Sequence, residues 1–225
     1  MALRFGSTGN EVDGIGKGDQ KMIAIVNYGS GNLAAISNIY KQLNIPHAIV
    51  EEPAKLAGAD HYILPGVGHF DYTMRTIRKS GMFDALQENV IVKGKPILGI
   101  CIGMQVLANS SEEGDCSGLG WIPGRVRKIQ AEERGVRLPH MGWNSIAITC
   151  DDTGLFNGVD EAIGFYFLHS YYFDTMSTSS VLATTDYGGE LVCGVTNMRN
   201  IFGLQFHPEK SHRNGIVVFK NFAFI

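Results

Sequence analysis

The chain has 225 residues, which is enough for one large α/β domain with a substantial buried core. Its 44% hydrophobic and 18% charged residues indicate an ordinary globular protein, and its net charge of -3 argues against a nucleic-acid-binding surface. No apolar run reaches the ~18 residues of a membrane span and no N-terminal segment has the apolar core of a signal peptide, so we expect a cytoplasmic protein.

Four cysteines are scattered without the spacing of a zinc site or of a disulfide framework: Cys101, Cys116, Cys150 and Cys193. This use of cysteine fits a reducing compartment. We therefore expect free thiols, no bound metal ion and no cofactor.

Residues 1–20 show no hydrophobic period, and we interpret them as a flexible leader or an appended remnant outside the fold. The folded domain is predicted to span residues 21–225. Its first half alternates apolar runs with amphipathic stretches, which predicts strands at 22–26, 48–50, 61–64 and 97–100 and helices at 33–43, on both sides of Gly81 and at 104–108.

Each predicted strand is apolar on both faces, which is typical of a parallel sheet covered by helices on both sides. The second half has short runs with β character, among them 201–206, and is predicted to add an antiparallel β layer before a closing helix at 215–222. The predicted fold class is therefore α/β with a mainly parallel central sheet. Functional loops of such sheets lie at the carboxyl ends of strands, where 28–32, 65–68 and Cys101 are expected to converge.

Cys101 directly follows the buried strand and has a glycine two residues away on either side, Gly99 and Gly103. Small neighbours are needed where a reactive side chain lies at a sharp strand-to-helix turn. The partial positive charge at a helix N-terminus also favours thiolate over thiol. A buried structural cysteine explains the same pattern taken alone, so this candidate nucleophile needs support from the rest of the chain.

A cysteine nucleophile needs a base, and the base needs an orienting group. His207 and Glu209 supply this pair, because residues two apart in an extended chain project to the same side. Pro208 stiffens the backbone between them. A surface turn with a solvated histidine and glutamate is the alternative interpretation.

The oxyanion that forms during attack on a carbonyl needs two donors, usually backbone N–H groups. Ile102, next to the candidate nucleophile, is one candidate and Val67 is the other. Gly66 and Gly68 flank Val67 and permit its peptide to flip, so this second donor is expected to be switchable. An ordinary glycine turn is the alternative.

Five segments, taken together and in order, resemble the class I (triad) glutamine amidotransferases and, within that class, the glutaminase subunit of imidazole glycerol phosphate synthase. The resemblance to the class rests on residues 99–105 and 206–209, and the narrower one on 65–70, 138–144 and 167–171. It covers about residues 22–225, and the joint occurrence of all five segments makes it specific.

The resemblance implies that Cys101 attacks the side-chain amide of L-glutamine, that His207 moves protons and that Glu209 orients His207. A glutamyl thioester then forms and is hydrolysed to glutamate, and ammonia is released. The oxyanion donors implied are Val67 and Ile102, and the glutamine-binding residues implied are Gly66, Gly68, Gln105, Ser170 and Tyr171.

The resemblance further implies that the ammonia enters a partner synthase, a (β/α)₈ barrel, for an imidazole-forming cyclisation in histidine biosynthesis. Direct transfer matters because ammonia that is protonated in water loses its nucleophilicity. The positions that match the docking surface are Asn32, Pro139, Met141, Trp143 and Lys210. Lys210 matches a residue that pairs with an acidic residue of the partner. For Met141 and Trp143, the alternative interpretation is a place in the core.

Two features depart from the family pattern: Asn27 stands where many relatives carry an acidic residue, and residues 1–20 have no counterpart. They leave open a relative that feeds another synthase, such as one that aminates a surface sugar. A non-catalytic binding subunit on the same fold is a further alternative, but it should lack part of the triad. A peptidase or other cysteine hydrolase is disfavoured by Gln105 and the segment 139–144.

Overall fold

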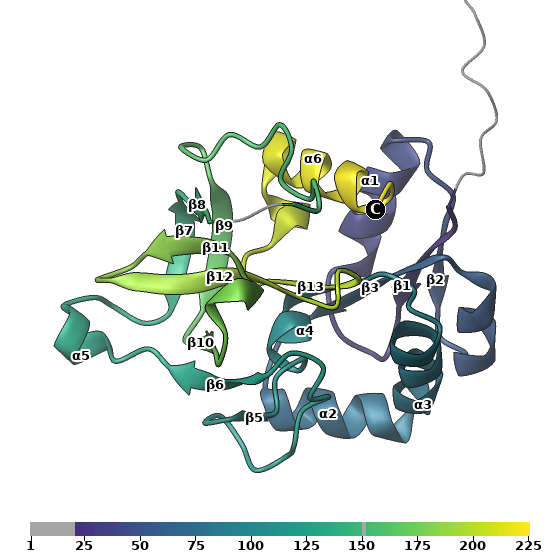
Figure 1. Cartoon of the computed structure of the whole chain (residues 1–225), viewed down its shortest axis with the longest axis horizontal. Coiled ribbons are helices and arrows are strands. Elements are labelled where there is room, and N and C mark those ends of the chain that lie inside the picture. The colour runs from purple at the N-terminus through teal and green to yellow at the C-terminus, as the bar shows by residue number, and fades with distance from the viewer. Residues whose placement is uncertain (1–20, 150–151) are drawn as a thin grey trace, which may run out of the picture.

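A computed structural model describes residues 21–149 and 152–225, so the leader predicted for residues 1–20 lies outside the described residues. Its central feature is an eight-stranded sheet in the order β2-β1-β3-β4-β13-β12-β11-β8 (Figure 1). The first five of these strands run parallel to one another, and the last three are antiparallel. The parallel strands are β1 (Ile23–Val26), β2 (His47–Val50), β3 (His61–Gly66), β4 (Ile97–Cys101) and β13 (Ile201–Leu204).

Helices cover both faces of the parallel half, as predicted. Successive residues of β1 alternate between two apolar cores, with Ile23 and Ile25 in one and Ala24 and Val26 in the other. The first core contains residues of α1 (Leu33–Gln42) and α6 (His212–Phe222). The second contains residues of α2 (Phe70–Lys79), α3 (Met82–Leu86) and α4 (Ile102–Gln105). The strands are therefore buried on both sides, which explains their apolar composition.

The predicted break in the second helical stretch is confirmed at Gly81. Helix α2 ends at Lys79, and Gly81 has a φ of 76°, a conformation that favours glycine. Helix α3 then begins at Met82 and continues into a π-helical turn, η2 (Gln87–Val92). The remaining short helices are η1 (Pro53–Gly58), α5 (Ala131–Arg134), η3 (Thr178–Ser180) and η4 (Pro208–Lys210).

The second half supplies the antiparallel strands, partly within the main sheet and partly as two small sheets (Figure 1). Strands that extend the main sheet are β12 (Glu190–Asn197), β11 (Val181–Asp186) and β8 (Ala147–Ile148). One small sheet joins β10 (Tyr171–Thr175), β6 (Gly124–Lys128) and β5 (Ser110–Ser111), in which β10 and β6 are antiparallel and β5 and β6 are parallel. The other joins the antiparallel strands β7 (His140–Asn144) and β9 (Phe165–His169).

One detail of the predicted layout is wrong. Strand β13 does not belong to an antiparallel layer, because it lies in the centre of the main sheet and runs parallel to β4. All four of its residues are buried, which is the pattern of the other central strands. As a result, the carboxyl ends of β4 and β13 lie side by side, and the segments that follow them, from Cys101 and from Gln205, leave the sheet at the same edge.

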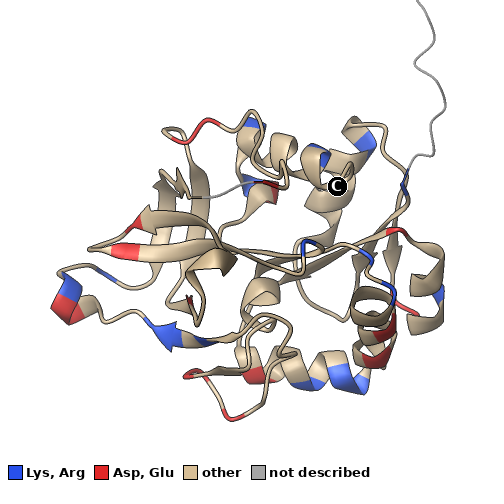
Figure 2. Cartoon of the chain, in the orientation of Figure 1, with Lys and Arg blue, Asp and Glu red and all other residues tan. Residues whose placement is uncertain are grey.

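Charged side chains of both signs are distributed over the fold (Figure 2). Strand β6 carries a basic run, but Arg127 Nε lies 2.6 Å from the carboxylate of Asp174 and Arg125 lies 4.0 Å from Glu112. Neighbouring acids therefore balance the two arginines of this strand. Among the described residues, no helix is long and apolar enough to cross a membrane.

Candidate active site

Cys101 lies at the end of β4, where the chain turns sharply into α4. Its backbone has φ 56° and ψ −112°, a left-handed conformation that is uncommon for a residue with a side chain. Helix α4 begins directly at Ile102 and ends at Gln105, so it starts earlier and is shorter than the helix predicted for 104–108. The thiol therefore lies at the tip of a strained strand-to-helix turn.

The two flanking glycines are required by the packing of this turn. A Cβ atom on Gly103 would collide with the carbonyl oxygen of Leu64 on the neighbouring strand. A Cβ atom on Gly99 would collide with the backbone of Gly103 and would come within 2.8 Å of the Met104 nitrogen. The glycines thus allow β3, β4 and α4 to approach one another closely at the point where Cys101 is presented.

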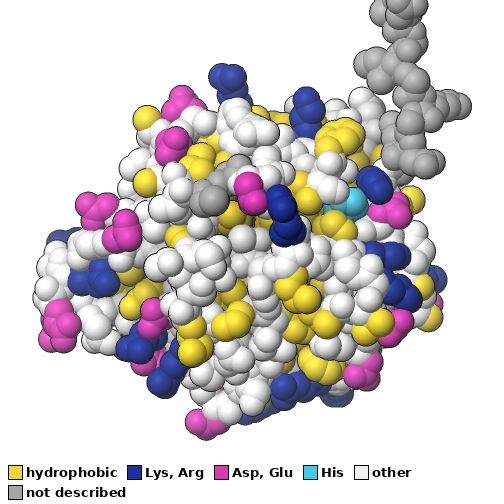
Figure 3. Space-filling view, in the orientation of Figure 1, with side chains coloured by type: hydrophobic (Ala, Val, Ile, Leu, Met, Phe, Trp, Pro, Cys, Tyr) yellow, Lys and Arg dark blue, Asp and Glu magenta, His cyan; other side chains and the backbone are white. Residues whose placement is uncertain are grey.

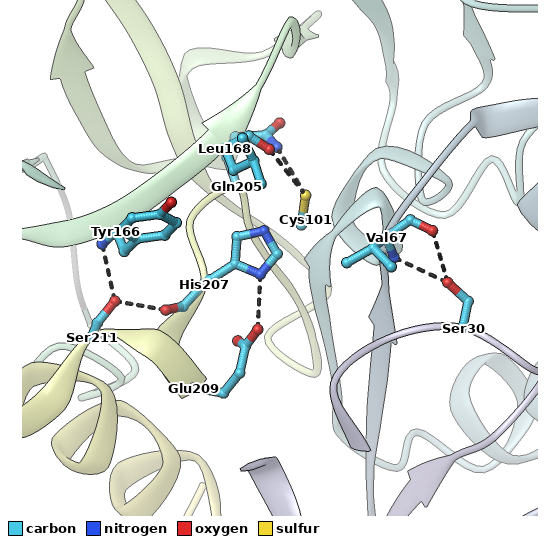
Figure 4. Close-up of polar contacts among 9 residues, drawn as sticks. All are labelled: Ser30, Val67, Cys101, Tyr166, Leu168, Gln205, His207, Glu209 and Ser211. Carbon is cyan, nitrogen blue, oxygen red and sulfur yellow. Dashed lines mark hydrogen bonds and ion pairs between the residues drawn. The ribbon is translucent and has the colours of Figure 1, made fainter. Parts of the chain in front are cut away.

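His207 lies beside Cys101, with its imidazole between the sulfur and the carboxylate of Glu209 (Figure 4). Its Nδ1 atom is 2.8 Å from Glu209 Oε1, and both side chains are almost completely buried. The backbone is fixed as well, because the His207 N–H donates to Tyr166 O at 2.9 Å and the Ser211 hydroxyl donates to His207 O at 2.6 Å. This arrangement is that of a base held by an orienting carboxylate.

The environment of His207 favours the protonated imidazole. Burial by itself lowers the pKa of His207, but the hydrogen bond with the Cys101 side chain and the contact with Glu209 outweigh it and raise the pKa to about 10. At neutral pH the ring is therefore an imidazolium next to the sulfur. Such a cation stabilises negative charge on the nucleophile and has a proton ready for a leaving group.

Two further groups contact the sulfur. The side-chain amide of Gln205, which is fully buried, lies with Nε2 3.8 Å from Cys101 Sγ, and the carbonyl oxygen of Leu168 lies 3.9 Å from it. The same Gln205 amide accepts a bond of 3.0 Å from Gln105 Nε2. The nucleophile is thus held among groups from β4, β9 and the end of β13 (Figure 4).

These side chains open into a cavity of about 290 Å³, close to the lower end of the usual range for small-molecule sites. Nine of the residues predicted from the sequence line it: Val67, Gly68, Cys101, Ile102, Gln105, Pro139, Ser170, Tyr171 and His207. Glu209 lies behind His207, and Gly66 lies opposite Cys101 in the register of β3 and β4. The cavity therefore joins the candidate nucleophile, base, oxyanion segment and substrate residues.

The oxyanion segment is held in a specific way. The N–H of Val67 donates to Ser30 Oγ at 3.0 Å, and the Ser30 hydroxyl donates to the Val67 carbonyl at 2.8 Å (Figure 4). Both polar atoms of Val67 therefore bond to one serine hydroxyl. In this state the N–H of Val67 is used within the chain.

The predicted docking residues lie around the cavity on exposed surface. Met141 and Trp143 are 65% and 44% exposed, since alternate residues of β7 point outward while His140 points inward. Trp143 stacks on His212 at a ring distance of 5.4 Å, and Lys210 Nζ lies 5.5 Å above the Tyr166 ring. Asn32 is exposed at the start of α1, and Pro139 lines the cavity itself.

Exposed apolar side chains do not by themselves indicate a docking surface. On the face drawn in Figure 3, apolar side chains are scattered among charged and polar ones, as on most protein surfaces. Met141 lies opposite Leu168, a residue of the cavity wall, in the pairing of β7 and β9, and Val67 of the same cavity is 49% exposed.

Five residues of this site were given no individual role from the sequence, although some lie in segments named there: Ser30, Glu113, Leu168, His169 and Gln205. Glu113 places a carboxylate in the cavity wall and accepts a bond of 2.8 Å from the N–H of Phe70 at the start of α2. The chain around Glu113 is polar and contains several acidic residues. No local pattern therefore singled out Glu113 as a residue of the cavity.

The other cysteines that the structure describes have different surroundings. Cys193 is completely buried in a core, and burial raises the pKa of its thiol. Cys116 lies in the loop beside α2, where its N–H donates to Asp71. Cys150 lies outside the described residues. No group of three or more potential metal ligands occurs within residues 21–149 and 152–225.

The geometry is that expected of a cysteine hydrolase, with Cys101, His207 and Glu209 together at the carboxyl ends of central strands of an α/β sheet. The model of the class-I glutamine amidotransferase family matches residues 24–225. The chain therefore belongs to the class-I glutamine amidotransferase family and, within it, to the HisH subunits of imidazole glycerol phosphate synthase.

The relatives that place it there are closely similar over nearly their whole length. The HisH subunit of imidazole glycerol phosphate synthase from Bdellovibrio bacteriovorus is 49% identical over 205 residues, which are 90% of this chain and 99% of the relative. The corresponding subunit from Leptospira borgpetersenii is 47% identical, with coverage of 90% and 99%.

Solved structures with lower sequence identity share the fold. PurLQS from Thermotoga maritima superimposes with a TM-score of 0.69 at 21% identity, covering 90% of this chain and 97% of that one. A glutamine amidotransferase from the same organism gives a TM-score of 0.61 at 17% identity, covering 88% and 80%. The predicted α/β architecture is thus confirmed.

Proposed function

We propose that this chain hydrolyses glutamine and supplies the ammonia to the synthase subunit of imidazole glycerol phosphate synthase in histidine biosynthesis. The observation that carries the proposal is the buried Cys101–His207–Glu209 arrangement at the floor of a cavity of about 290 Å³. We take residues 21–225 as one amidotransferase domain, because strands from both halves of the chain build one continuous sheet.

In the first step, the sulfur of Cys101 attacks the side-chain amide carbon of glutamine. The His207 imidazolium, one of whose nitrogens is held by Glu209, then donates its proton to the departing amide nitrogen. Ammonia leaves and a glutamyl thioester remains on Cys101. In the second step, neutral His207 accepts a proton from water, whose oxygen attacks the thioester, and glutamate is released.

Binding of glutamine requires groups that match its charged α-substituents. Glu113 lines the cavity and is the acidic partner that we assign to the α-ammonium group. Gln105, Ser170 and Tyr171 supply polar groups along the same wall, and Gly68 leaves the segment beside the substrate without a side chain. A cavity with one buried triad and one carboxylate suits a free amino acid better than a peptide.

The oxyanion formed in both steps needs two N–H donors, which we assign to Ile102 and Val67. The Val67 N–H is bonded to Ser30 in the described state, so it has to be released before it can serve. Gly66 and Gly68 permit this rearrangement at little conformational cost. We therefore infer that the free chain is a poor glutaminase and that docking of the synthase favours the released state.

Delivery of ammonia requires the cavity to be closed against water. We assign this role to a (β/α)₈ barrel subunit that docks on Asn32, Pro139, Met141, Trp143 and Lys210. Met141 and Trp143 provide exposed apolar area beside the cavity, and Lys210 provides a positive charge next to the catalytic Glu209. We place the complex in the cytoplasm, where the Cys101 thiol stays reduced.

The proposal is tested by incubating the chain with glutamine, alone and with the barrel synthase and its nucleotide substrate, while glutamate is measured. We expect slow hydrolysis alone, and hydrolysis with imidazole formation in the complex. Glutamate release that depends on Cys101 but is not coupled to this synthase would assign the ammonia to a different acceptor. No hydrolysis in either condition would contradict the proposal.

A further inference from the structure

Two buried histidines that the mechanism does not use connect β7, which carries Met141 and Trp143, with the glutamine cavity. His140, on β7, is 3% exposed, and His169, at the end of β9, is 7% exposed. His140 Nδ1 lies 2.9 Å from His169 Nε2, so the two rings are directly bonded. His169 also lines the cavity.

The partners of these rings determine where their protons lie. His169 Nδ1 is 2.8 Å from the carbonyl oxygen of Tyr171, which can only accept, so Nδ1 carries the hydrogen. In a neutral ring Nε2 then accepts, and His140 Nδ1 must be the donor to it. His140 Nε2 in turn accepts from Asn144 Nδ2 at 3.3 Å, while the same amide donates to Asp186 O at 2.8 Å. Each ring is thereby held in one tautomer.

Aromatic packing fixes the His140 ring in this position. It stacks on Tyr187 at a ring distance of 3.9 Å and on Phe167 at 4.5 Å, with interplanar angles of 19° and 16°. Tyr187 is anchored by its hydroxyl, which donates to Arg137 O at 2.7 Å. Burial lowers the pKa of His140 to about 4 and that of His169 to about 3, so both rings are neutral at physiological pH.

From His169, these hydrogen bonds continue to Gln105, a residue assigned to glutamine binding. The Tyr171 carbonyl that accepts from His169 also accepts from Gln105 Nε2 at 3.0 Å. Gln105 Nε2 donates as well to Gln205 Oε1, so both amide hydrogens of Gln105 are used. Its Oε1 atom is therefore the group that is left to accept from a substrate in the cavity.

We propose that His169 is a positioning residue for glutamine recognition, and that His140 holds it in the tautomer that this role requires. His169 fixes the Tyr171 carbonyl, the carbonyl fixes the Gln105 amide, and the amide presents its oxygen to glutamine. Since β7 also carries Met141 and Trp143, the docking surface and the glutamine cavity share one rigid element. This inference rests on the proposed glutaminase activity.

Two substitutions at one position separate this role from simple packing. In His169→Asn, the side-chain nitrogen takes the place of Nδ1 and can still donate to Tyr171 O. In His169→Gln, the longer side chain takes the place of Nε2, so the contact with His140 is kept and the bond to Tyr171 is lost. Glutaminase kinetics of both variants are measured in the complex with the barrel synthase, and their melting temperatures are measured alongside.

We expect His169→Gln to raise KM for glutamine about tenfold, the effect of one hydrogen bond, with kcat changed less than about threefold. His169→Asn should keep KM within about twofold of wild type, even where its melting temperature falls. Because a histidine substitution can impair folding, His140→Phe provides a second variant that keeps the stacking between Phe167 and Tyr187. It removes the donor to His169 and the acceptor for Asn144, whose amide keeps its bond to Asp186 O. It should raise KM about threefold.

Equal KM values in wild type, His169→Gln and His140→Phe, with lower melting temperatures, would show that the pair serves stability only and would overturn the proposal. An equal rise in KM for His169→Asn and His169→Gln would show that the Tyr171 bond is not the operative contact, which also overturns it. If the wild-type complex released no glutamate, the proposed function itself would fail, and the two failures are therefore distinguishable.

Discussion

The two walls of the glutamine cavity are built differently. On one side, the side chains of Cys101, His207 and Glu209 are buried, and His207 is bonded to Glu209, to the backbone of β9 and to the Ser211 hydroxyl that precedes α6. On the other side, Val67 is 49% exposed and is held by a single serine hydroxyl between two glycines. The first wall is assembled before any partner arrives, and the second is held in a state in which its N–H is not available.

This difference indicates where regulation is least costly. Rearranging the triad would break the buried pair of His207 and Glu209 and leave buried charges unpaired, which is energetically unfavourable. Releasing Val67 requires only two hydrogen bonds to one surface serine to be exchanged, which corresponds to about 1–3 kcal/mol. We infer that partner docking controls the oxyanion wall and leaves the triad wall unchanged.

The largest effect should come from the nucleophile on the rigid wall. Cys101→Ala should lower glutamine-dependent synthesis in the complex by about 10⁴-fold or more, because no other described thiol lines the cavity. Synthesis from added ammonium salt should be preserved, since the partner's chemistry is untouched. Equal loss of both activities would contradict the assignment, and Cys116→Ala serves as the matched control.

His207 and Glu209 should follow in that order. His207→Ala is expected to approach the loss seen for Cys101→Ala, as members of one catalytic unit are not additive. Glu209→Gln should lower kcat at least about tenfold less than His207→Ala does. The amide can still orient the ring, but it cannot stabilise the imidazolium. Steady-state kcat of both variants in the complex checks the order, and a His207→Ala enzyme with most of its kcat would require another base.

A change at Val67 should act only on the adjustable wall. Val67→Pro has no N–H to donate, so it should remove most of the stimulation by the partner, a loss of about 10²–10³ in kcat. The complex should still form, which is measured by co-elution in size-exclusion chromatography. Full stimulation in this variant would mean that the second oxyanion donor lies elsewhere.

Ser30→Ala provides the opposite test of the same wall. Without its hydroxyl, neither polar atom of Val67 is held, so the free chain should hydrolyse glutamine about 5–10-fold faster than wild type. The rate in the complex should change little. The measurement is glutamate release by the isolated variant, with Ser37→Ala, a serine on α1, as the matched control. An unchanged basal rate would show that Ser30 does not restrain Val67.

The sequence predicted Cys101, His207 and Glu209 far better than the polar groups that hold Cys101 and Val67 in place, for a physical reason. Cys101 with its flanking glycines and the pair His207 and Glu209 are short-range patterns whose spacing reflects local backbone geometry. Ser30 and Gln205, in contrast, meet their partners across 37 and 100 residues of chain, respectively. Both are common polar residues, and no local pattern marks which of them the fold brings to the site.

The same distinction applies to the fold. Apolar runs predicted the buried strands and the helices on both faces, because burial imposes composition directly. Strand β13 was misplaced in the antiparallel half because its apolar residues specify burial and not strand direction. The contact between His140 and His169 was not predicted either, since a buried, neutral histidine has no signature in sequence spacing.

A smaller effect concerns stability in acid. His140 and His169 have folded pKa values of about 4 and about 3, below the ordinary value near 6.5. At these two positions the unfolded chain therefore binds more protons below about pH 6.5, so the two rings lower the unfolding free energy as pH falls, by roughly 1–2 kcal/mol per pH unit. His207, whose pKa is raised, acts in the opposite direction, mainly above about pH 6.5, where its unfolded form loses its proton. Denaturant unfolding between pH 7 and pH 5 measures the slope, and His169→Asn, with one titrating ring fewer, should reduce it.

The most direct test of the contrast between the walls is the reactivity of Cys101 in the free chain. A small alkylating agent such as iodoacetamide needs the nucleophile and His207 but no oxyanion hole. Mass-spectrometric mapping should show fast modification of Cys101 without the partner, slowed at least tenfold in His207→Ala, while glutamine hydrolysis by the same free chain stays slow. Slow modification of Cys101 in the wild-type free chain would show that the triad itself awaits the partner and would contradict this account.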